Sequence, residues 1–255
     1  MAFTKASVQD VLHPSKNQYI NGAVYSREIG ATAPDVAPDA RCPFCLKLAM
    51  VPDWHQGRVQ GFFHRHRGSS GTCPLVTTGV QPVGFQAESS SDLKAYSSHR
   101  DAFLEVWYHQ YLAMKRQIGS LDIERFVRLV EHADILRLWA HPEFRLNDVP
   151  AVLLVLSDLL ADTSDAKKPV WVRFRFAGLA SSLDDLWRRK KTPALFKLSY
   201  KPRPDGRLPN YKELTDCTRV IIDWRSVPGA YGGPSQMEST AFEAAFSTAG
   251  KAEAL

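Results

Sequence analysis

Four side chains near the start of the chain have the types and spacing of a closed metal site. Cys42 and Cys45 lie in the segment Cys-Pro-Phe-Cys, a histidine follows in Phe-Phe-His-Arg-His, and Cys73 comes shortly afterwards. A Cys-x2-Cys turn presents two thiolates together, and a second pair of ligands from about 20 to 30 residues further on completes a tetrahedron. Zinc prefers thiolate and imidazole ligands of this kind. The sequence therefore predicts a zinc site made by Cys42, Cys45, His64 or His66, and Cys73.

The choice between His64 and His66 stays open at this point, because they lie two residues apart and would share one face of a strand. Three cysteines and one histidine leave no coordination position for water, so the predicted zinc is structural and activates no nucleophile. The alternative is that Cys42 and Cys45 form a redox pair or are plain buried cysteines. Such a pair would need neither Cys73 nor a histidine downstream.

The predicted ligands belong to a small module of two hairpins. The first hairpin is expected over residues 41–50, and the returning strands over residues 57–66. This segment has few large apolar residues, so metal binding would supply much of its folding free energy. Nearby cations, Lys47, Arg58 and Arg65 among them, could offset the charge of three thiolates.

Residues 41–74 resemble the zinc ribbon at the front of competence protein CoiA-like proteins. The shared pattern is Cys-Pro-x-Cys, a spacer, Phe-x-His, a Gly/Ser loop and a final Cys. The resemblance implies the same ligands as the spacing does. Members of that family typically follow the ribbon with a restriction-endonuclease-like nuclease domain, so the resemblance also implies DNA as the class of partner.

A nuclease of that type needs an Asp near one strand and a Glu-x-Lys or Glu-x-Gln on the next, so that carboxylates hold magnesium beside the scissile phosphate. Ala133-Asp134-Ile135 is similar to the first element, which makes Asp134 the candidate catalytic residue. The apolar run 152–156 has leucines where the second element would place its carboxylate. Asp165-Ala166-Lys167 lies in a polar segment that is expected to be a loop. Magnesium is therefore expected only if the chain is a nuclease, and a non-enzymatic role is the first expectation.

Length and composition limit the class of protein. The chain has 255 residues, of which 44% are hydrophobic, so it can bury a sizeable core and suits one medium domain with a small appended module. The first residues contain no apolar signal region, and no apolar stretch approaches the roughly 20 residues that cross a bilayer. Cys217 is the one cysteine outside the predicted site. Metal-type cysteine spacing makes a reducing cytoplasm the expected setting, with no membrane partner.

The formal charge of +5 and the pI near 9.0 indicate an affinity for polyanions, and nucleic acid, first of all DNA, is the expected partner. Basic side chains gather in three places along the sequence. They are Arg65 with Arg67, the run Arg188, Arg189, Lys190 and Lys191, and the group Lys197, Lys201 and Arg203. The alternative for the run at 188–191 is the solvated C-terminal end of a helix, where cations are favoured.

The segment 170–176 alternates strictly and is the clearest strand in the sequence. Its valines and phenylalanines are expected to be buried, with Trp171, Arg173 and Arg175 facing outward. An aromatic ring and two arginines on one surface could stack a base and bind the adjoining phosphates. The alternative is that the arginines pair with carboxylates on a neighbouring strand.

Periodicity predicts the remaining elements. Residues 98–117 and 121–139 read as amphipathic helices in an antiparallel hairpin, and 150–160 as a buried helix or strand, with Pro150 favouring a helix. Further strands are expected at 194–200 and 218–224. The predicted fold class is α+β, a small N-terminal zinc ribbon followed by a mixed helix/sheet domain.

The predicted domain organisation has four parts. Residues 1–40 form an irregular segment, 41–90 the zinc ribbon and a linker, 91–228 the α/β domain, and 229–255 a tail. Phe242 and Phe246 stand four residues apart in the tail, which allows a short helix that docks on a partner or on the domain itself.

Three functions are compatible with this sequence. The first is a zinc-ribbon nucleic-acid-binding accessory or recognition subunit of a bacterial DNA-handling system, of the competence-like, mobile-element or phage-defence kind. The second is a magnesium-dependent nuclease of restriction-endonuclease-like type, and the third is a non-enzymatic adaptor that binds other proteins. Salt-sensitive binding of nucleic acid separates the first from the third, and magnesium-dependent cleavage identifies the second.

Overall fold

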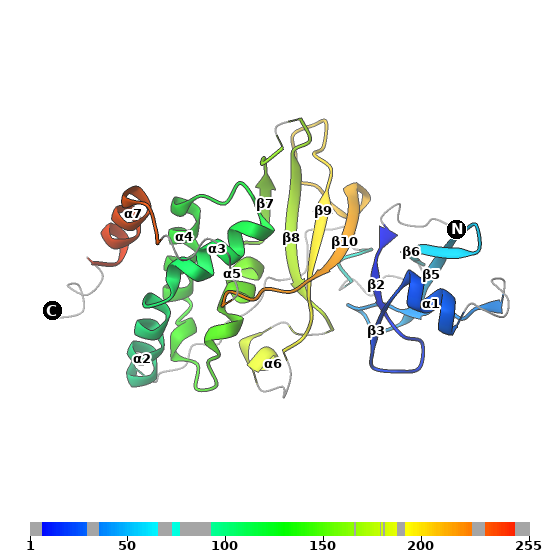
Figure 1. Cartoon of the computed structure of the whole chain (residues 1–255), viewed down its shortest axis with the longest axis horizontal. Coiled ribbons are helices and arrows are strands. Elements are labelled where there is room, and N and C mark those ends of the chain that lie inside the picture. Colours follow the sequence, from blue (N-terminus) through cyan, green and yellow to red (C-terminus); the bar gives the residue numbers. More distant parts are fainter. Residues whose placement is uncertain are drawn as a thin grey trace.

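The computed structural model describes residues 7–29, 36–65, 73–76, 93–165, 167–178, 180, 182–187, 192–225 and 233–247. In this part of the chain, ten strands form one mixed sheet, and helices complete an α+β fold (Figure 1). The strands are β1 (Ser7–Val8), β2 (Asp10–Leu12), β3 (Tyr19–Asn21), β4 (Ala40–Arg41), β5 (Leu48–His55), β6 (Arg58–His64), β7 (Leu159–Asp162), β8 (Val170–Phe176), β9 (Leu195–Tyr200) and β10 (Leu214–Val220).

The sheet has the strand order β3-β2-β4-β5-β6-β1-β10-β9-β8-β7. β1 connects its two halves: Val8 is opposite Phe62 of β6 in an antiparallel pair and opposite Cys217 of β10 in a parallel pair. Strands from the first 65 residues and strands from beyond residue 158 therefore share one set of backbone hydrogen bonds. The domain boundaries inferred from the sequence stay a prediction, and the sheet runs across them.

The helices are close to the predicted positions but differ in their ends. The segment 98–117, predicted as one helix, forms two helices that are interrupted after Leu104. The Asp122 side chain caps the next helix by accepting a hydrogen bond of 2.8 Å from the Arg125 amide. The helices are α1 (Gly22–Glu28), α2 (Leu93–Leu104), α3 (Trp107–Gln117), α4 (Ile123–Ile135), α5 (Val149–Leu156), α6 (Leu183–Trp187) and α7 (Gln236–Ser247), with 3-10 turns η2 (Leu138–Ala140), η3 (Leu146–Asp148) and η4 (Tyr211–Glu213).

The strands β8 to β10 are covered on both faces. On one face, Val172, Phe174 and Phe176 pack in a core with α3, α4 and α5. On the other face, Phe196 and Leu198 belong to a second core with the N-terminal strands. Figure 1 shows α3, α4 and α5 on one side of these strands, and the N-terminal strands with α1 on the other. The central sheet is therefore an internal layer.

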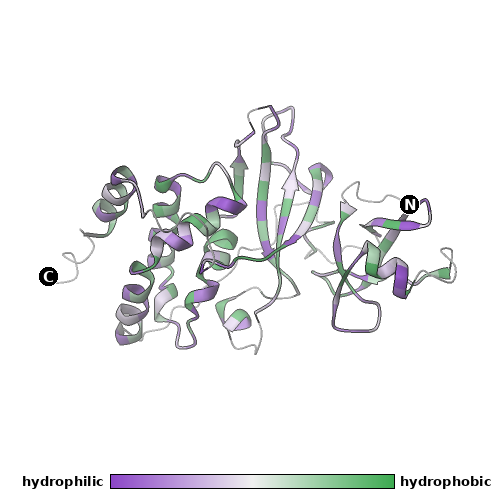
Figure 2. Ribbon diagram, viewed as in Figure 1, coloured by the Kyte–Doolittle hydropathy of each residue, from purple (hydrophilic) through white to green (hydrophobic). Residues whose placement is uncertain are grey.

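This layering corrects the predicted outward face of β8. The alternation itself is confirmed, and Figure 2 shows hydrophobic and hydrophilic colours alternating along β8. However, the face of Trp171, Arg173 and Arg175 is turned toward the second core instead of open solvent, and Trp171 packs against that core. Arg173 is only 5% exposed. An alternating pattern predicts two faces, but it does not tell whether a second layer covers the polar one.

The predicted helix in the tail exists as α7 and docks on the domain itself. Its Phe242 stacks on Trp107 of α3 with ring centroids 4.0 Å apart, and it is 4% exposed. The next turn brings Phe246 under the Arg100 guanidinium of α2 at 5.4 Å. In the described part of the chain, none of the helices combines the length and apolar character that a membrane crossing requires.

Gly22 begins α1 at a place where the helix touches the backbone of β6. A Cβ atom on Gly22 would clash with the carbonyl oxygen of Val59. We therefore expect Gly22→Ala to push α1 off the sheet and to lower the free energy of unfolding by about 1 to 3 kcal/mol. Chemical denaturation measures this loss. Ala23→Ser, at an exposed position of the same helix, should stay within about 0.5 kcal/mol of the parent, and an equal loss in both variants would refute the clash.

Candidate metal centre

Three segments of the chain bring the predicted ligands together. Cys42 and Cys45 lie on the turn between β4 and β5, His64 is the last residue of β6, and Cys73 opens the turn 73–76. Their ligand atoms all lie within 4.8 Å of one another. His64 is therefore the histidine of the cluster, and His66 lies outside the described residues. The four side chains could hold a metal ion.

Two distances within the cluster match those of a tetrahedral metal bound by sulfur and nitrogen. With a Zn–S distance of about 2.3 Å and tetrahedral angles, two thiolate sulfurs lie about 3.8 Å apart, and a sulfur and an imidazole nitrogen about 3.5 Å apart. The Cys42 and Cys73 sulfurs are 3.8 Å apart, and the Cys45 sulfur is 3.5 Å from His64 Nε2. The donor set therefore fits zinc in both chemistry and spacing.

Backbone hydrogen bonds hold the Cys-x2-Cys turn in its shape. The Cys42 amide donates to the Lys47 carbonyl at 2.9 Å, and the Leu46 amide donates to the Cys42 carbonyl at 3.0 Å. Leu46 adopts a left-handed backbone with φ 61°, which lets the chain reverse directly after Cys45. The Phe44 amide donates to the Cys42 sulfur at 3.4 Å. Such an amide stabilises a thiolate, as a metal ligand requires.

His64 reaches the cluster because of the pairing between β5 and β6. Met50 is opposite His64 in this antiparallel pair, so the end of β6 lies beside the start of β5 and the Cys-x2-Cys turn that precedes it. Arg65, the next residue, donates its amide to the Ala49 carbonyl at 2.6 Å and its guanidinium to Asp39 at 3.2 Å. These contacts set the position of His64 before any metal is bound.

The cysteine thiols of the cluster influence one another strongly. Burial raises the pKa of the Cys42 thiol, whereas hydrogen bonds from Cys42 and Cys73 lower the pKa of Cys45. The pKa of Cys73 is raised to about 12, because its hydrogen bond with Cys42, which acts the other way, is outweighed by its contact with Cys45 and by burial. The three thiols therefore compete for the same protons. A metal would displace the remaining protons, so its affinity should fall as the pH falls.

The metal turn also packs on the central sheet. Phe44, between the two cysteines, meets Phe196 of β9 edge to face with ring centroids 5.2 Å apart. The Pro43 carbonyl accepts a hydrogen bond of 2.7 Å from the Gly178 amide, which follows β8. Cys42 and Cys73 belong to the second core, together with Cys217 of β10. The cluster is therefore built into the core that the N-terminal strands share with β9 and β10.

Asp134, the candidate catalytic residue, belongs to a network of side chains. Its carboxylate accepts two hydrogen bonds of 3.0 Å from the Arg100 guanidinium, one of 3.1 Å from the Tyr96 hydroxyl and one of 2.5 Å from the Trp139 indole. These donors join α2 and η2 to the end of α4. Among the described residues, the cluster of Cys42 and its partners is the only group of three or more side chains placed to hold a metal. The contacts of Asp134 are those of a structural carboxylate.

The residues predicted to bind nucleic acid do not form one surface among the described residues. Arg173 forms an ion pair with Asp158, which directly precedes β7 and is not itself on a strand. Burial lowers the pKa of Arg175 to about 10, with the neighbouring charge of Arg173 as the next cause. Arg65 pairs with Asp39 beside the metal cluster. Arg67 and the run Arg188, Arg189, Lys190 and Lys191 lie outside the described residues.

The structure places a different set of cations together. β8 and β9 are antiparallel, with Trp171 opposite Tyr200, so the turn before β8 and the loop after β9 lie at the same end of the sheet. We name these two segments, 163–169 and 201–213, the basic turns. Their exposed cations are Lys167, Lys168, Lys201, Arg207 and Lys212. The sequence shows these residues as separate small groups, and only the strand pairing reveals that they are neighbours.

Comparisons with protein-family models, with curated proteins and with solved structures gave no match for this chain.

Proposed function

We propose that this chain is a zinc-stabilised nucleic-acid-binding protein that serves as an accessory or recognition subunit in a bacterial DNA-handling system. In this proposal, zinc on Cys42, Cys45, His64 and Cys73 stabilises the core that the N-terminal strands share with β9 and β10. The basic turns contact the phosphate backbone. The two tasks are separate, because a site with four protein ligands leaves no position for a substrate.

The observation that carries the nucleic-acid part is the gathering of exposed cations on the basic turns. Five lysines and arginines project from two neighbouring segments at one end of the sheet. The carboxylates there are Asp165, Asp205 and Glu213, fewer than the cations. Asp205 forms an ion pair with Arg203 at 2.7 Å, and Glu213 completes a capping box with Asn210. The excess of positive charge supports binding of a polyanion, and its exposure allows contact without rearrangement of the core. Tyr211, on the same loop, adds an aromatic ring.

A second candidate function, a protein-binding adaptor, is supported by the surface of the metal turn. Leu46 is 43% exposed and Leu48 is 58% exposed, on either side of the exposed Lys47. Large apolar side chains on a turn that a metal holds rigid are suited to a protein interface. The nuclease function has less support, because the Asp134 carboxylate already accepts hydrogen bonds from Arg100, Tyr96 and Trp139.

The proposal is tested by neutralising the basic turns. A variant with glutamine at all five cations should bind single- and double-stranded DNA more weakly, and each lost phosphate contact should flatten the salt slope by about 0.7 to 0.9. Fluorescence anisotropy over a salt series measures both quantities. The matched control carries glutamine at five exposed cations of other regions, Lys16, Lys94, Arg116, Arg128 and Arg137.

Equal losses in the two variants would show that the binding follows net charge alone and would refute the basic turns as the interface. A further variant with glutamine at residues 188–191 tests the run predicted from the sequence. If all three variants bind DNA and RNA as tightly as the parent protein, and binding by the parent does not depend on salt concentration, the result favours the adaptor function. Magnesium-dependent cleavage by the parent would instead establish a nuclease.

A further inference from the structure

The loop 201–213, one of the two basic turns, carries an exposed apolar side chain among its cations. Leu208 is 63% exposed and belongs to neither of the two cores. Single exposed apolar residues are ordinary on a protein surface, but this one directly follows the exposed Arg207. Among the described residues of the basic turns, Leu208 is the one large hydrophobic side chain that is exposed. The loop therefore offers positive charge and an apolar surface at the same point.

Hydrogen bonds close this loop at its base. The Lys201 amide donates to the Glu213 carbonyl at 2.9 Å. The Asn210 amide donates to the Glu213 carboxylate at 2.8 Å, and the Asn210 side chain accepts a hydrogen bond of 2.9 Å from the Lys212 amide. Pro209 is buried, so the chain is anchored directly after the exposed leucine. The two ends of the loop are thus fixed relative to each other.

A second set of contacts shapes the tip of the loop. The Gly206 amide donates to the Arg203 carbonyl at 3.1 Å, and Gly206 has φ 70°, a left-handed conformation that suits glycine. The Asp205 carboxylate accepts hydrogen bonds of 3.0 and 2.7 Å from the Arg203 guanidinium and one of 3.1 Å from the Arg207 amide. A Cβ atom on Gly206 would meet nothing within 4 Å, so the space beside the tip is open. Leu208 is therefore presented by a loop whose shape is set before binding, which lowers the entropic cost of an interface.

The loop carries more cations than carboxylates. Its charged residues are Lys201, Arg203, Arg207, Lys212, Asp205 and Glu213. Both carboxylates are engaged inside the loop, one with Arg203 and the other with the Asn210 amide. Figure 1 shows the loop at the top of the view, beside the other basic turn and beyond the helices and the N-terminal strands. A projecting loop with excess positive charge is suited to a groove between phosphates.

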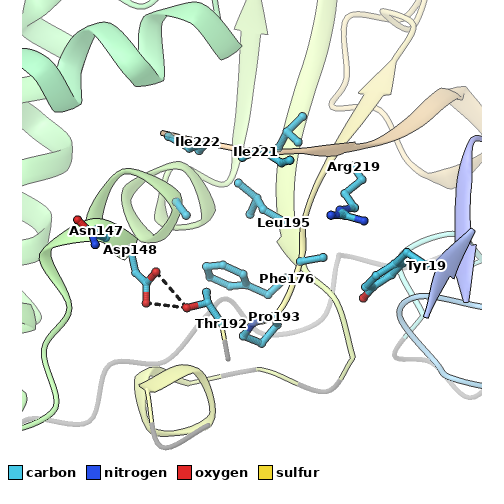
Figure 3. A pocket seen from close by; sticks show the side chains of 13 residues that line it. Tyr19, Asn147, Asp148, Phe176, Thr192, Pro193, Leu195, Arg219, Ile221 and Ile222 are labelled. Atoms are coloured by element: carbon cyan, nitrogen blue, oxygen red, sulfur yellow. Dashed lines mark hydrogen bonds between the residues drawn. The ribbon is translucent and has the colours of Figure 1, made fainter. Parts of the chain in front are cut away.

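The opposite ends of the same strands form a hollow instead of a projection. A pocket of about 290 Å³ lies there (Figure 3). The Asp148 carboxylate in its wall accepts hydrogen bonds from the Thr192 hydroxyl at 3.0 Å and from the Trp187 indole at 3.1 Å. A pocket of this volume is too small to admit a nucleic-acid duplex. Of these two ends of the strands, the projecting one is therefore suited to enter a groove.

We infer that Leu208 is a wedge that enters the minor groove of duplex DNA and partly separates two stacked base pairs. Leucine is one of the apolar side chains that kink DNA in this way in minor-groove proteins, where lysine and arginine contact the groove beside it. An aliphatic tip favours a duplex over a single strand, because the bases of a single strand stack on aromatic rings. The inference rests on the proposed nucleic-acid function of the basic turns and adds the form of the DNA, the groove and a bend.

The test uses the full-length protein and short DNA duplexes with a dye at each end, so that energy transfer reports bending. A central TA step is easily kinked, whereas an A-tract is stiff. The parent should bend the TA duplex by about 20 to 90° and bind it about tenfold more tightly than the A-tract duplex. Binding without a bend, or equal affinity for the two duplexes, would refute the wedge.

Three variants connect the bend to Leu208. Leu208→Ala should remove most of the bend and weaken binding to the TA duplex about tenfold, while the salt slope stays that of the parent because no phosphate contact is lost. Leu208→Met keeps an apolar wedge and should keep the bend. The matched control is Ile135→Ala, at a residue of α4 that is 78% exposed and lies outside the basic turns, and it should behave as the parent does.

A bend like that of the parent in Leu208→Ala, or an equal loss in Ile135→Ala, would overturn the assignment. Thermal denaturation confirms that each variant is folded.

The same measurements separate this inference from the proposed function. If the parent binds no DNA at any salt concentration, both are refuted. If the basic-turn variant flattens the salt slope but Leu208→Ala still bends the duplex, the function stands and only the wedge is refuted. Vesicles of anionic phospholipid provide the last comparison: vesicle binding that requires Leu208, without a bend in DNA, would assign the loop to a membrane surface instead.

Discussion

Cys42→Ser is expected to release the bound metal and to unfold the N-terminal strands together with part of the central sheet. Cys42 is fully buried, accepts the Phe44 amide and lies 3.8 Å from the Cys73 sulfur. Structural zinc contributes on the order of 10 kcal/mol to the folding of small metal domains, which is comparable with the whole stability of a protein of this size. Loss of one thiolate should therefore cost most of that contribution.

The extent of the unfolding follows from the position of the cluster. Phe44 packs on Phe196, and Cys42 belongs to the core that contains β9 and β10. Hydrogen exchange in Cys42→Ser should therefore increase in β9 and β10 as well as in β4 to β6. If the metal site were instead a separate ribbon with its own core, hydrogen exchange in Cys42→Ser would increase only over residues 40–65. Metal content by elemental analysis and exchange by mass spectrometry measure the two effects.

Cys217→Ala is the matched control, since Cys217 is also a fully buried cysteine of the same core but lies outside the cluster. It should keep one metal ion per chain and lose only the packing of a small side chain. A chelator should reproduce the effect of Cys42→Ser on the parent protein. Full metal content in Cys42→Ser, or equal metal loss in Cys217→Ala, would overturn the assignment of the ligands.

Asp134→Ala is expected to destabilise the helical part without creating or removing any metal site. The carboxylate is the common acceptor for Arg100 on α2, Tyr96 on α2 and Trp139 on η2. The side chains of Arg100 and Asp134 are 16% and 21% exposed, so removal of the carboxylate leaves a poorly hydrated guanidinium without its partner. We expect the free energy of unfolding to fall by about 3 kcal/mol.

The matched control for Asp134→Ala lies on the same helix. Glu131→Ala, at an exposed position of α4, should change stability by less than about 0.5 kcal/mol. Asp134→Asn should fall between the two, because an amide oxygen can still accept a hydrogen bond from the indole or the hydroxyl. If Asp134→Ala is as stable as the parent and abolishes a magnesium-dependent cleavage, the residue is catalytic and the network has been misread.

Much of the metal site was predictable because its determinants are local or depend on ligand chemistry alone. The Cys-x2-Cys turn brings two thiolates together through the backbone, and Cys73 and a histidine follow at a distance suited to zinc. The α+β class, the helix at α5 and the strand β8 were also predictable, since periodicity and proline position report local conformation. The break between α2 and α3 was missed, because apolar spacing continues across Glu105 and Val106.

Contacts between distant segments could be identified only from the tertiary structure. His64 could be chosen as the ligand only once β6 was paired with β5, since two residues of spacing on a strand leave both histidines on one face. Asp134 resembled a catalytic carboxylate until Arg100 and Tyr96, more than thirty positions earlier in the chain, were found beside it.

By itself, the sequence determined the ligand chemistry, the fold class and most of the elements, because side-chain type and short-range periodicity act over a few residues. Only the tertiary structure decided that the metal turn is part of a core shared with β9 and β10, that Arg173 lies beneath a second layer, and that the basic turns meet at one end of the sheet. The physical reason is that burial and proximity depend on which surfaces pack together. That packing is a property of the whole chain, and no local pattern encodes it.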